Sequence, residues 1–170
     1  MPKTFDSIAS VTLTSTATVI NFTNIPQTFT DLVLVANVTG ISNTNDFSMR
    51  VGNTSIDTGS NYSSNYMRGN GSTGGAGASQ NSTYIILNSG DSTPTNDNAM
   101  FVSNFMGYTN ANDKQVVTRW GQAATSAGLI TSQWRGGSSP IKLIQIFLNT
   151  AQTYTFSAGS KFSLYGIKAA

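Results

Sequence analysis

The sequence has 170 residues, of which only 9% are charged, and it contains no His, no Cys and no Glu. Disulfides, zinc sites with His or Cys ligands, and Ser-His-Asp or Cys-His nucleophiles are therefore excluded. The nine cationic and seven acidic residues give a net charge of +2, but the cations are scattered, whereas nucleic-acid binding usually needs them clustered, so we expect no nucleic-acid partner.

The first part of the chain mixes apolar residues with Ser and Thr, which predicts short β-strands. Residues 5–22 are rich in β-branched residues at mostly two-residue or irregular spacing, and Pro26 closes this segment because proline cannot donate to a sheet ladder. Residues 31–38 are apolar on both faces, which predicts a central strand covered on both sides. Residues 47–51 and 62–67 predict two more strands, the first with one wet face.

The middle of the chain contains a glycine-rich segment, residues 69–79, which offers almost nothing to bury. We expect this segment to be a loop. A short buried strand over residues 84–87 and a second polar loop over residues 88–98 follow. Turns rich in Asn, Asp, Gly and Ser then separate three further expected strands, over residues 100–108, 115–122 and 129–134.

The last part of the chain contains a strongly apolar run over residues 141–148. Its flanking Pro140 and Asn149 and its β-branched content favour a strand over a helix. Tyr154 and Phe156, a turn, and then residues 162–167 predict a closing hairpin. No run approaches the ~20 apolar residues of a membrane span, so we expect no membrane partner.

These segments together predict an all-β fold. About ten to twelve short strands have the spacing of a sandwich or jelly roll, and no fixed internal repeat or domain boundary is visible. We therefore expect residues 1–170 to form a single-domain antiparallel β-sandwich, jelly-roll-like in its topology. The first seven residues contain no apolar core of a signal peptide, so export by that route is not expected.

The Asp residues are the remaining candidates for catalysis or metal binding. A glycoside hydrolase needs two carboxylates at a fixed separation, and the pairs nearest in sequence are Asp91 with Asp97 and Asp46 with Asp57. The loop over residues 91–98 offers oxygen ligands for Ca²⁺ but matches no EF-hand. Each of these Asp residues lies in a turn-like segment, where a carboxylate typically caps the backbone. We therefore expect no enzymatic activity, no metal and no cofactor.

Two pairs of neighbouring Arg and Trp residues define a candidate ligand or interface surface. With nearby Tyr residues they would form an aromatic platform for a sugar, since sugars stack on aromatic faces. The alternative, which the usual burial of Trp favours, is that both indole rings fill the core while the Arg residues point outward. The candidate residues are Trp120, Trp134, Tyr62, Tyr66, Arg119 and Arg135, together with Tyr108.

Four segments carry a resemblance to a known family. They are Phe-Asp-Ser-Ile-Ala at residues 5–9, Ile-Pro-Gln-Thr-Phe-Thr-Asp-Leu at residues 25–32, Gly-Ser-Asn-Tyr at residues 59–62, and Phe-Ser-Leu-Tyr-Gly-Ile at residues 162–167. Each motif is short, but in this order and spacing the chain resembles small virion structural proteins of tailed bacteriophages, including phages of cyanobacteria and marine bacteria. The likeness spans nearly the whole chain.

The resemblance implies a β-sandwich displayed on a virion and assembled in the host bacterial cytoplasm, commonly as a homotrimer. Its partners would be major capsid or tail proteins, and no catalytic residues carry over. A chain that begins directly with a strand favours a compact capsid decoration or cement protein over a tail-fibre tip. A receptor-binding module for host-surface carbohydrate is the alternative, and a glycoside hydrolase with two Asp residues is the third reading.

Overall fold

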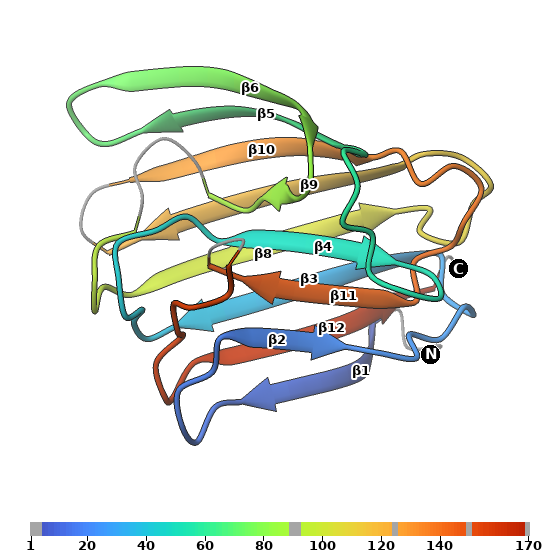
Figure 1. Cartoon of the computed structure of the whole chain (residues 1–170), viewed down its shortest axis with the longest axis horizontal. Coiled ribbons are helices and arrows are strands. Elements are labelled where there is room, and N and C mark those ends of the chain that lie inside the picture. The colour runs from blue at the N-terminus through green and yellow to red at the C-terminus, as the bar shows by residue number, and fades with distance from the viewer. Residues whose placement is uncertain (1–4, 89–92, 124–125, 149–150, 169–170) are drawn as a thin grey trace.

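The computed structural model describes residues 5–88, 93–123, 126–148 and 151–168, and their regular structure is entirely β-strand (Figure 1). The strands are β1 (Phe5–Thr12), β2 (Val19–Phe22), β3 (Asp31–Val38), β4 (Ser48–Gly52), β5 (Tyr62–Gly69), β6 (Gly74–Ser82), β7 (Ile85–Ile86), β8 (Ala99–Met106), β9 (Lys114–Gln122), β10 (Ala127–Trp134), β11 (Leu143–Phe147) and β12 (Lys161–Ile167). Among these described residues there is no helix long and apolar enough to span a lipid bilayer. The expected all-β fold is confirmed.

The strands form two antiparallel sheets that pack face to face. The large sheet has the order β1-β12-β3-β8-β9-β10-β5-β6, and the small sheet has the order β2-β11-β4-β7. The antiparallel pairs β5·β6, β4·β7, β3·β8, β2·β11 and β1·β12 nest inside one another and alternate between the two sheets. One long two-stranded ribbon therefore winds around the core, as in a jelly roll, with β9 and β10 inserted into the large sheet.

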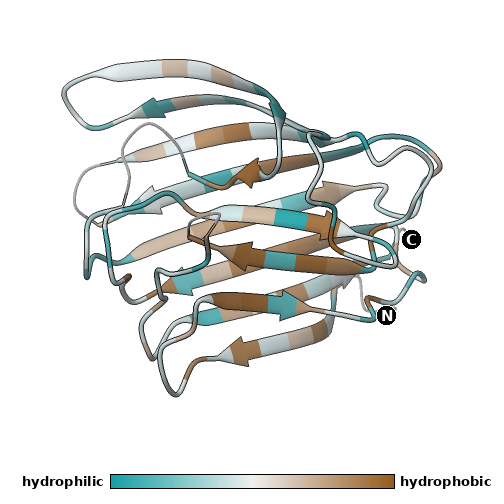
Figure 2. Cartoon of the chain, viewed as in Figure 1, coloured by the Kyte–Doolittle hydropathy of each residue, from teal (hydrophilic) through white to brown (hydrophobic). Residues whose placement is uncertain are grey.

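Alternating side chains fill the space between the sheets. Along β8, Phe101 and Phe105 are buried whereas Met100 and Met106 are exposed. Four phenylalanine rings contact one another in the core with centroid separations of 5.2 to 6.5 Å: Phe47, Phe101, Phe156 and Phe162. Burying each such ring contributes roughly 1.5–3 kcal/mol, so this cluster is a main source of stability. In Figure 2, β11 in the small sheet is largely hydrophobic and β6 is nearly neutral.

The position of β3 agrees with its prediction, but its burial does so only in part. The strand lies in the interior of the large sheet, between β12 and β8. Leu32, Leu34, Ala36 and Val38 face the core, whereas Val35 is only half-buried and Asn37 is exposed. On the second face only Val33 is buried, at 6% exposure, so the prediction of cover on both sides holds at that end of the strand and is wrong for Val35 and Asn37. Among the described residues, no second layer packs on this face of the large sheet.

The glycine-rich segment is mostly a strand and not the predicted loop. Gly74–Ser82 forms β6, and only the turn over residues 70–73 between β5 and β6 is irregular. Gly77 lies opposite Tyr66, and a Cβ added there would collide with the Tyr66 hydroxyl; Gly75 lies opposite Arg68, whose Nε is 3.5 Å from the corresponding Cβ position. The glycines therefore leave room for the long side chains of β5. Those side chains in turn cover the glycine backbone, which compensates for the low strand propensity of glycine.

The end of the chain also differs from its prediction. Phe156 makes only isolated bridges, to Ala17 and to Ile41, and belongs to no strand. β12 pairs with β1 and β3, which lie far from it in sequence, and so it does not form a closing hairpin with residues 154–156. Phe156 instead inserts its ring between Phe47 and Phe162 in the core, and this packing decides its position.

Candidate functional site

The outer face of the large sheet points away from the small sheet and is uncovered in the described part of the chain. Successive side chains of a strand point to opposite faces, so every second residue of each strand contributes to this surface. The described residues include four exposed large hydrophobic side chains: Phe5 at 56%, Met67 at 61%, Met100 at 54% and Met106 at 46% exposure. The pairing registers place all four on this outer face.

One row of the outer face crosses six neighbouring strands and is mostly apolar. In register, Val35 pairs with Val102, Val102 with Arg119, Arg119 with Leu129, Leu129 with Met67, and Met67 with Ala76. We call Val35, Val102, Arg119, Leu129, Met67 and Ala76 the outer-face row. Arg119 is its one charged member and is exposed, so a guanidinium group with five donors stands among apolar neighbours.

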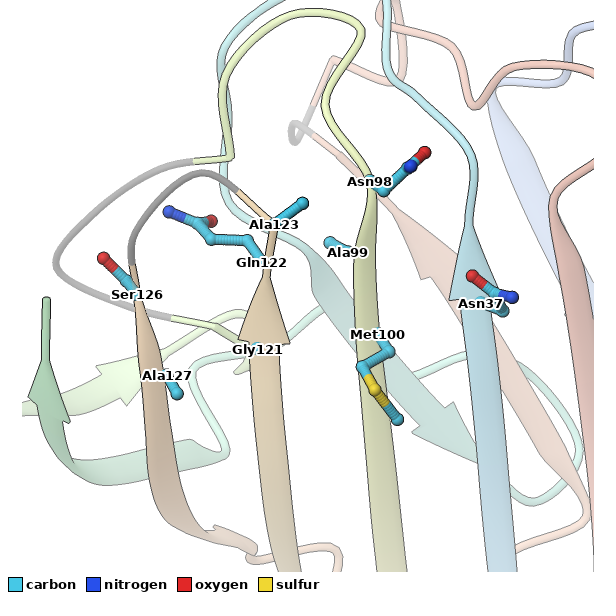
Figure 3. Close-up of a pocket in the computed structure, with 9 residues that line it drawn as sticks. All are labelled: Asn37, Asn98, Ala99, Met100, Gly121, Gln122, Ala123, Ser126 and Ala127. Carbon is cyan, nitrogen blue, oxygen red and sulfur yellow. The ribbon is translucent and has the colours of Figure 1, made fainter.

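Beside this row the sheet surface is hollowed. A hollow of about 630 Å³ is lined by residues of β3, β8, β9, β10 and the adjoining loops, and Figure 3 shows Met100 and Ala127 on the two strands that flank Gly121. A second hollow of about 350 Å³ continues from Met100 and Gly121 to Arg119. The hollow exists because Gly121 has no side chain: the nearest atom to a Cβ placed there is the Ala127 Cβ, at 3.9 Å.

The other half of the outer face is polar. A hollow of about 260 Å³ is lined there by amide and hydroxyl side chains, including those of Asn65, Gln115, Thr131 and Gln133. Neither this hollow nor the two around Gly121 contains an Asp among the described residues that line it. The outer face thus offers apolar contacts, neutral hydrogen-bonding groups and the cationic side chains of Arg119 and, on β12, Lys161.

The candidate aromatic platform does not assemble at the surface. Trp120 is 5% exposed, Trp134 is 3% exposed and Tyr62 is fully buried, in agreement with the alternative that the large rings fill the core. Tyr108, also fully buried, donates a hydrogen bond to the Pro26 carbonyl. A sugar therefore has no exposed indole face to stack on among these residues.

The remaining members of the predicted set are separated from one another. Tyr66 is half-buried and lies over Gly77. Arg119 is exposed on the outer face, on the opposite side of β9 from its neighbour Trp120. Arg135 follows β10 and donates hydrogen bonds to the Ser60 carbonyl (3.2 Å), to the Asn81 side chain (3.0 Å) and to Ser63. Of the six predicted residues, only Arg119 belongs to the outer-face row.

Asp57 lies at a separate polar hollow of about 510 Å³ beyond the end of β4. Its carboxylate accepts hydrogen bonds from Trp134 Nε1 (2.8 Å), Asn61 Nδ2 (2.9 Å) and the Gly59 amide (2.8 Å). Burial alone would raise the pKa of Asp57, but these three hydrogen bonds outweigh it and hold the pKa below its usual value. Asp57 therefore acts as an ionised structural anchor for the loop and for Trp134.

The candidate pair Asp46 and Asp57 is not brought together by the fold. Asp46 precedes β4 and Asp57 follows it, so five strand residues at about 3.3 Å each separate them, beyond the reach of glycosidase carboxylates. Asp91 lies outside the described residues, so its pair with Asp97 and the Ca²⁺ loop are not described as a whole. Within the described chain, no three acidic side chains gather as metal ligands would.

The sequence did contain a signal for the outer face that motif reasoning missed. Met100, Val102 and Met106 alternate with buried residues of β8, as a strand with two different faces requires. Which face remains uncovered depends on the layers, and these are set by pairing between segments that are distant in sequence.

Compared with known families and curated proteins, the sequence matches no family model and no curated protein. Among solved structures it is similar to the chicken liver homodimeric agglutinin CG-16, with 12% identity, 85% of this chain and 99% of that chain covered, and a TM-score of 0.37. It is also similar to the Caenorhabditis elegans galectin LEC-6 (10% identity, 94% and 96% covered, TM-score 0.35). A third similar structure is the CBM2 module of Lactobacillus casei BL23 phage J-1 evolved Dit (7% identity, 89% and 69% covered, TM-score 0.29). Likenesses this distant carry no conclusion about a ligand.

Proposed function

We propose that this chain is a non-enzymatic assembly protein that binds neighbouring protein subunits through the outer face of its large sheet. The observation that carries the proposal is that the four exposed large hydrophobic side chains of the described residues, Phe5, Met67, Met100 and Met106, all lie on that one face. Exposed apolar surface among polar groups is typical of protein contact sites. The virion of a tailed bacteriophage is the assembly that the sequence resemblance implies, with capsid decoration as the role.

The chemistry of the face supports a protein partner. Met and Arg are enriched in protein interfaces whereas Lys and Glu are depleted, and the outer-face row has Met67 and Arg119 without a Lys or an acidic residue. Methionine side chains adapt to the surface that they meet. A partner would place apolar side chains over the hollow at Gly121 and a carboxylate against Arg119.

The positions of the perturbed titratable groups support a role without catalysis. Asp57, Tyr62, Tyr108 and Lys114 have shifted pKa values, and none of them lines the three hollows of the outer face. Burial raises the pKa of Tyr62, whose hydroxyl is held by backbone groups of Val51 and Asp57. Shifted groups at active sites usually face a cleft. Asp57 does line the separate hollow beyond β4, but its carboxylate is held by three hydrogen bonds, and Tyr62, Tyr108 and Lys114 are held by hydrogen bonds to backbone carbonyls.

Incorporation into particles tests this proposal. Phage-producing cells would supply wild-type protein or the Met67→Ser/Met100→Ser variant, and mass spectrometry of purified virions would count copies per particle. We expect the variant to be incorporated at least about tenfold less, which corresponds to a loss of about 1.4 kcal/mol in binding. Asn21→Ser, at an exposed position of the small sheet, should be incorporated normally. Absence of the wild type from virions, or full incorporation of the face variant, would contradict the proposal.

Recognition of a host-surface glycan is the second candidate, and the hollow at Asp57 is what favours it. Polar groups of Asn53, Asn61 and Ser139 line this hollow, and Asn53 Oδ1 is a buried acceptor without a hydrogen-bond partner in the described chain. Sugar hydroxyl groups donate to such acceptors. Glycan-array binding that is lost in Asn53→Ala and retained in Met67→Ser/Met100→Ser would support this candidate, and an array with no bound glycan would reject it.

A further inference from the structure

The edges of the two sheets are not equally protected. An edge strand carries backbone N–H and C=O groups with no partner, and proteins protect such edges with charges, Pro, bulges or short strands. The small sheet ends in β2, with four residues, and β7, with two. In the large sheet, β1 has a bulge after Ser7 and an ion pair between Asp6 and Lys168 at 3.1 Å.

The other edge of the large sheet, β6, lacks most of this protection. It is nine residues long and contains neither a charge nor Pro. Its bulge lies near Asn81 at its C-terminal end, which leaves Gly74–Ser79 in regular pairing with β5. In the described part of the chain, β6 has no neighbour other than β5.

The register of the hairpin shows which backbone groups of β6 are free. Asn70 N donates to Thr73 O at 3.0 Å, so the pair that closes the turn is hydrogen-bonded. Hydrogen-bonded and non-hydrogen-bonded pairs alternate along an antiparallel ladder. Ala76, opposite Met67, and Ala78, opposite Asn65, therefore occupy non-hydrogen-bonded positions, and their N–H and C=O groups point toward the free edge.

We infer that β6 is a site of strand addition for a second copy of this chain. The β6 strands of two copies would pair antiparallel about a two-fold axis and join two large sheets into one. The site is the free backbone edge of β6 and not the side chains of the outer face, so the inference goes beyond the proposed function. The outer-face row ends at Ala76 on this edge, and pairing would therefore bring the outer faces of two copies into one continuous surface.

The chemistry of β6 selects a second copy over a foreign strand. Peptides that add to a sheet edge gain their specificity from side-chain pockets, and Gly74–Ser79 has only Gly, Ala and Ser side chains with which to build them. A symmetric pairing needs no such pockets, and without charges no residue repels its own copy across the axis. The β5–β6 hairpin also extends past the edge of the small sheet, which leaves room for a second molecule (Figure 1).

Proline at the free positions tests the inference. Ala76→Pro/Ala78→Pro removes two edge donors but leaves the hydrogen-bonded positions that face β5 intact. Analytical ultracentrifugation over a range of concentrations should give a wild-type dimer whose dissociation constant rises at least about tenfold in the proline variant. Ala76→Thr/Ala78→Thr keeps both N–H groups and should dimerise like the wild type. Circular dichroism of each variant shows whether the fold is retained.

Single cysteines provide a second readout, because the chain has no native Cys. Under oxidation, cysteines introduced one at a time along residues 74–79 should cross-link best at the position nearest the two-fold axis, whereas Ser7→Cys on β1 should remain uncross-linked. A wild-type mass of one or three copies at every concentration, or a dimer that the prolines leave unchanged, would overturn the inference. The outer-face variant Met67→Ser/Met100→Ser should still dimerise even if it fails to enter virions. Dimerisation through β6 can therefore be tested independently of the proposed function.

Discussion

Lys114 is a buried cation at the start of β9, with 1% of its surface exposed. Its ammonium group donates hydrogen bonds to the carbonyls of Asn110 (2.6 Å) and Asn112 and lies 3.5 Å from the Gly137 carbonyl. Burial lowers the pKa of Lys114, and the charge of Asp113 partly offsets this effect. The side chain thus ties the β8–β9 turn to the loop after β10 through backbone carbonyls.

Replacing this lysine should be costly because the carbonyls lose their donor. We expect Lys114→Met to lower the free energy of unfolding by about 1–3 kcal/mol, since buried polar groups left without a partner cost about that much. Urea denaturation followed by tryptophan fluorescence measures the change. Lys142→Met, at an exposed position, should remain within about 0.5 kcal/mol of the wild type. Equal losses in the two variants would contradict the role assigned to Lys114.

The stability of the fold depends on pH through Asp57. Its pKa in the folded protein is below its usual value, so the stabilisation by its carboxylate is present above about pH 4 and is lost as the pH falls through the folded pKa. We expect the melting temperature of the wild type to fall below pH 4 more steeply than that of Asp57→Asn. At pH 7 the variant should be less stable by about 1–2 kcal/mol, because the charge-assisted hydrogen bond from Trp134 is weakened.

Thermal melts followed by circular dichroism from pH 2 to pH 7 measure both effects of Asp57. Thr58→Ser, in the same exposed loop, should follow the wild-type profile. Parallel profiles for Asp57→Asn and the wild type would show that the carboxylate does not stabilise the fold.

At the scale of the elements, glycines opposite large side chains recur in the large sheet. Gly77 faces Tyr66, and Gly128 on β10 faces Trp120 on β9. A Cβ at Gly128 would lie 2.7 Å from Trp120 Nε1 and 2.5 Å from the Met67 carbonyl oxygen. The large rings of β5 and β9 can lie flat on the sheet only because these positions have no side chain.

Two glycine substitutions on neighbouring strands distinguish this packing effect from the general effect of replacing a glycine on backbone entropy. We expect Gly128→Ala to cost about 1–3 kcal/mol of unfolding free energy, because the methyl group overpacks a closed site. Gly121→Ala, with no atom closer than 3.9 Å to the added Cβ, should be neutral or should stabilise the protein by up to about 1 kcal/mol. Chemical denaturation of the two variants measures both, and the opposite order of stabilities would contradict this packing account.

The elements differ in how much their sequence predicts. Alternation and turn residues predicted β3 with its observed bounds and located most other strands within a few residues, because period-two burial is a local property. β6 was missed because its strand is held by backbone hydrogen bonds and by the side chains of β5, whereas pattern reasoning looks for side chains to bury. Sheet order was not predictable, since β12 pairs with β1 and β3 across most of the chain.

The candidate site was also hard to predict, because it depends on how segments distant in sequence pack together. Alternation alone predicts that Arg119 and Trp120 face opposite sides of the sheet, but it does not predict which of them faces the core. The layers decide this, and they bury Trp120 and Trp134 while they leave Arg119 exposed. The aromatic set predicted from neighbouring residues was therefore split by the fold, and the apolar outer face became visible only with the pairing registers.

At the scale of the whole molecule, the two layers are unequal. The large sheet has eight strands and the small sheet has four, and the small sheet packs on only one face of the large one. The outer face is left as a broad surface with exposed apolar side chains, few charges and a hollow at Gly121. The proposed function follows from this difference in size between the two sheets, because burial of the outer face requires a partner.

Methionine oxidation by dilute hydrogen peroxide, measured for each residue by peptide mass spectrometry, tests this central claim most directly. Met67, Met100 and Met106 are 61%, 54% and 46% exposed, and Met49 is fully buried and serves as the internal reference. In the isolated protein the three should oxidise at least about tenfold faster than Met49, because oxidation follows exposure. In purified virions they should become protected while Met49 is unchanged. Equal oxidation of these three residues in the free and assembled protein would contradict the account.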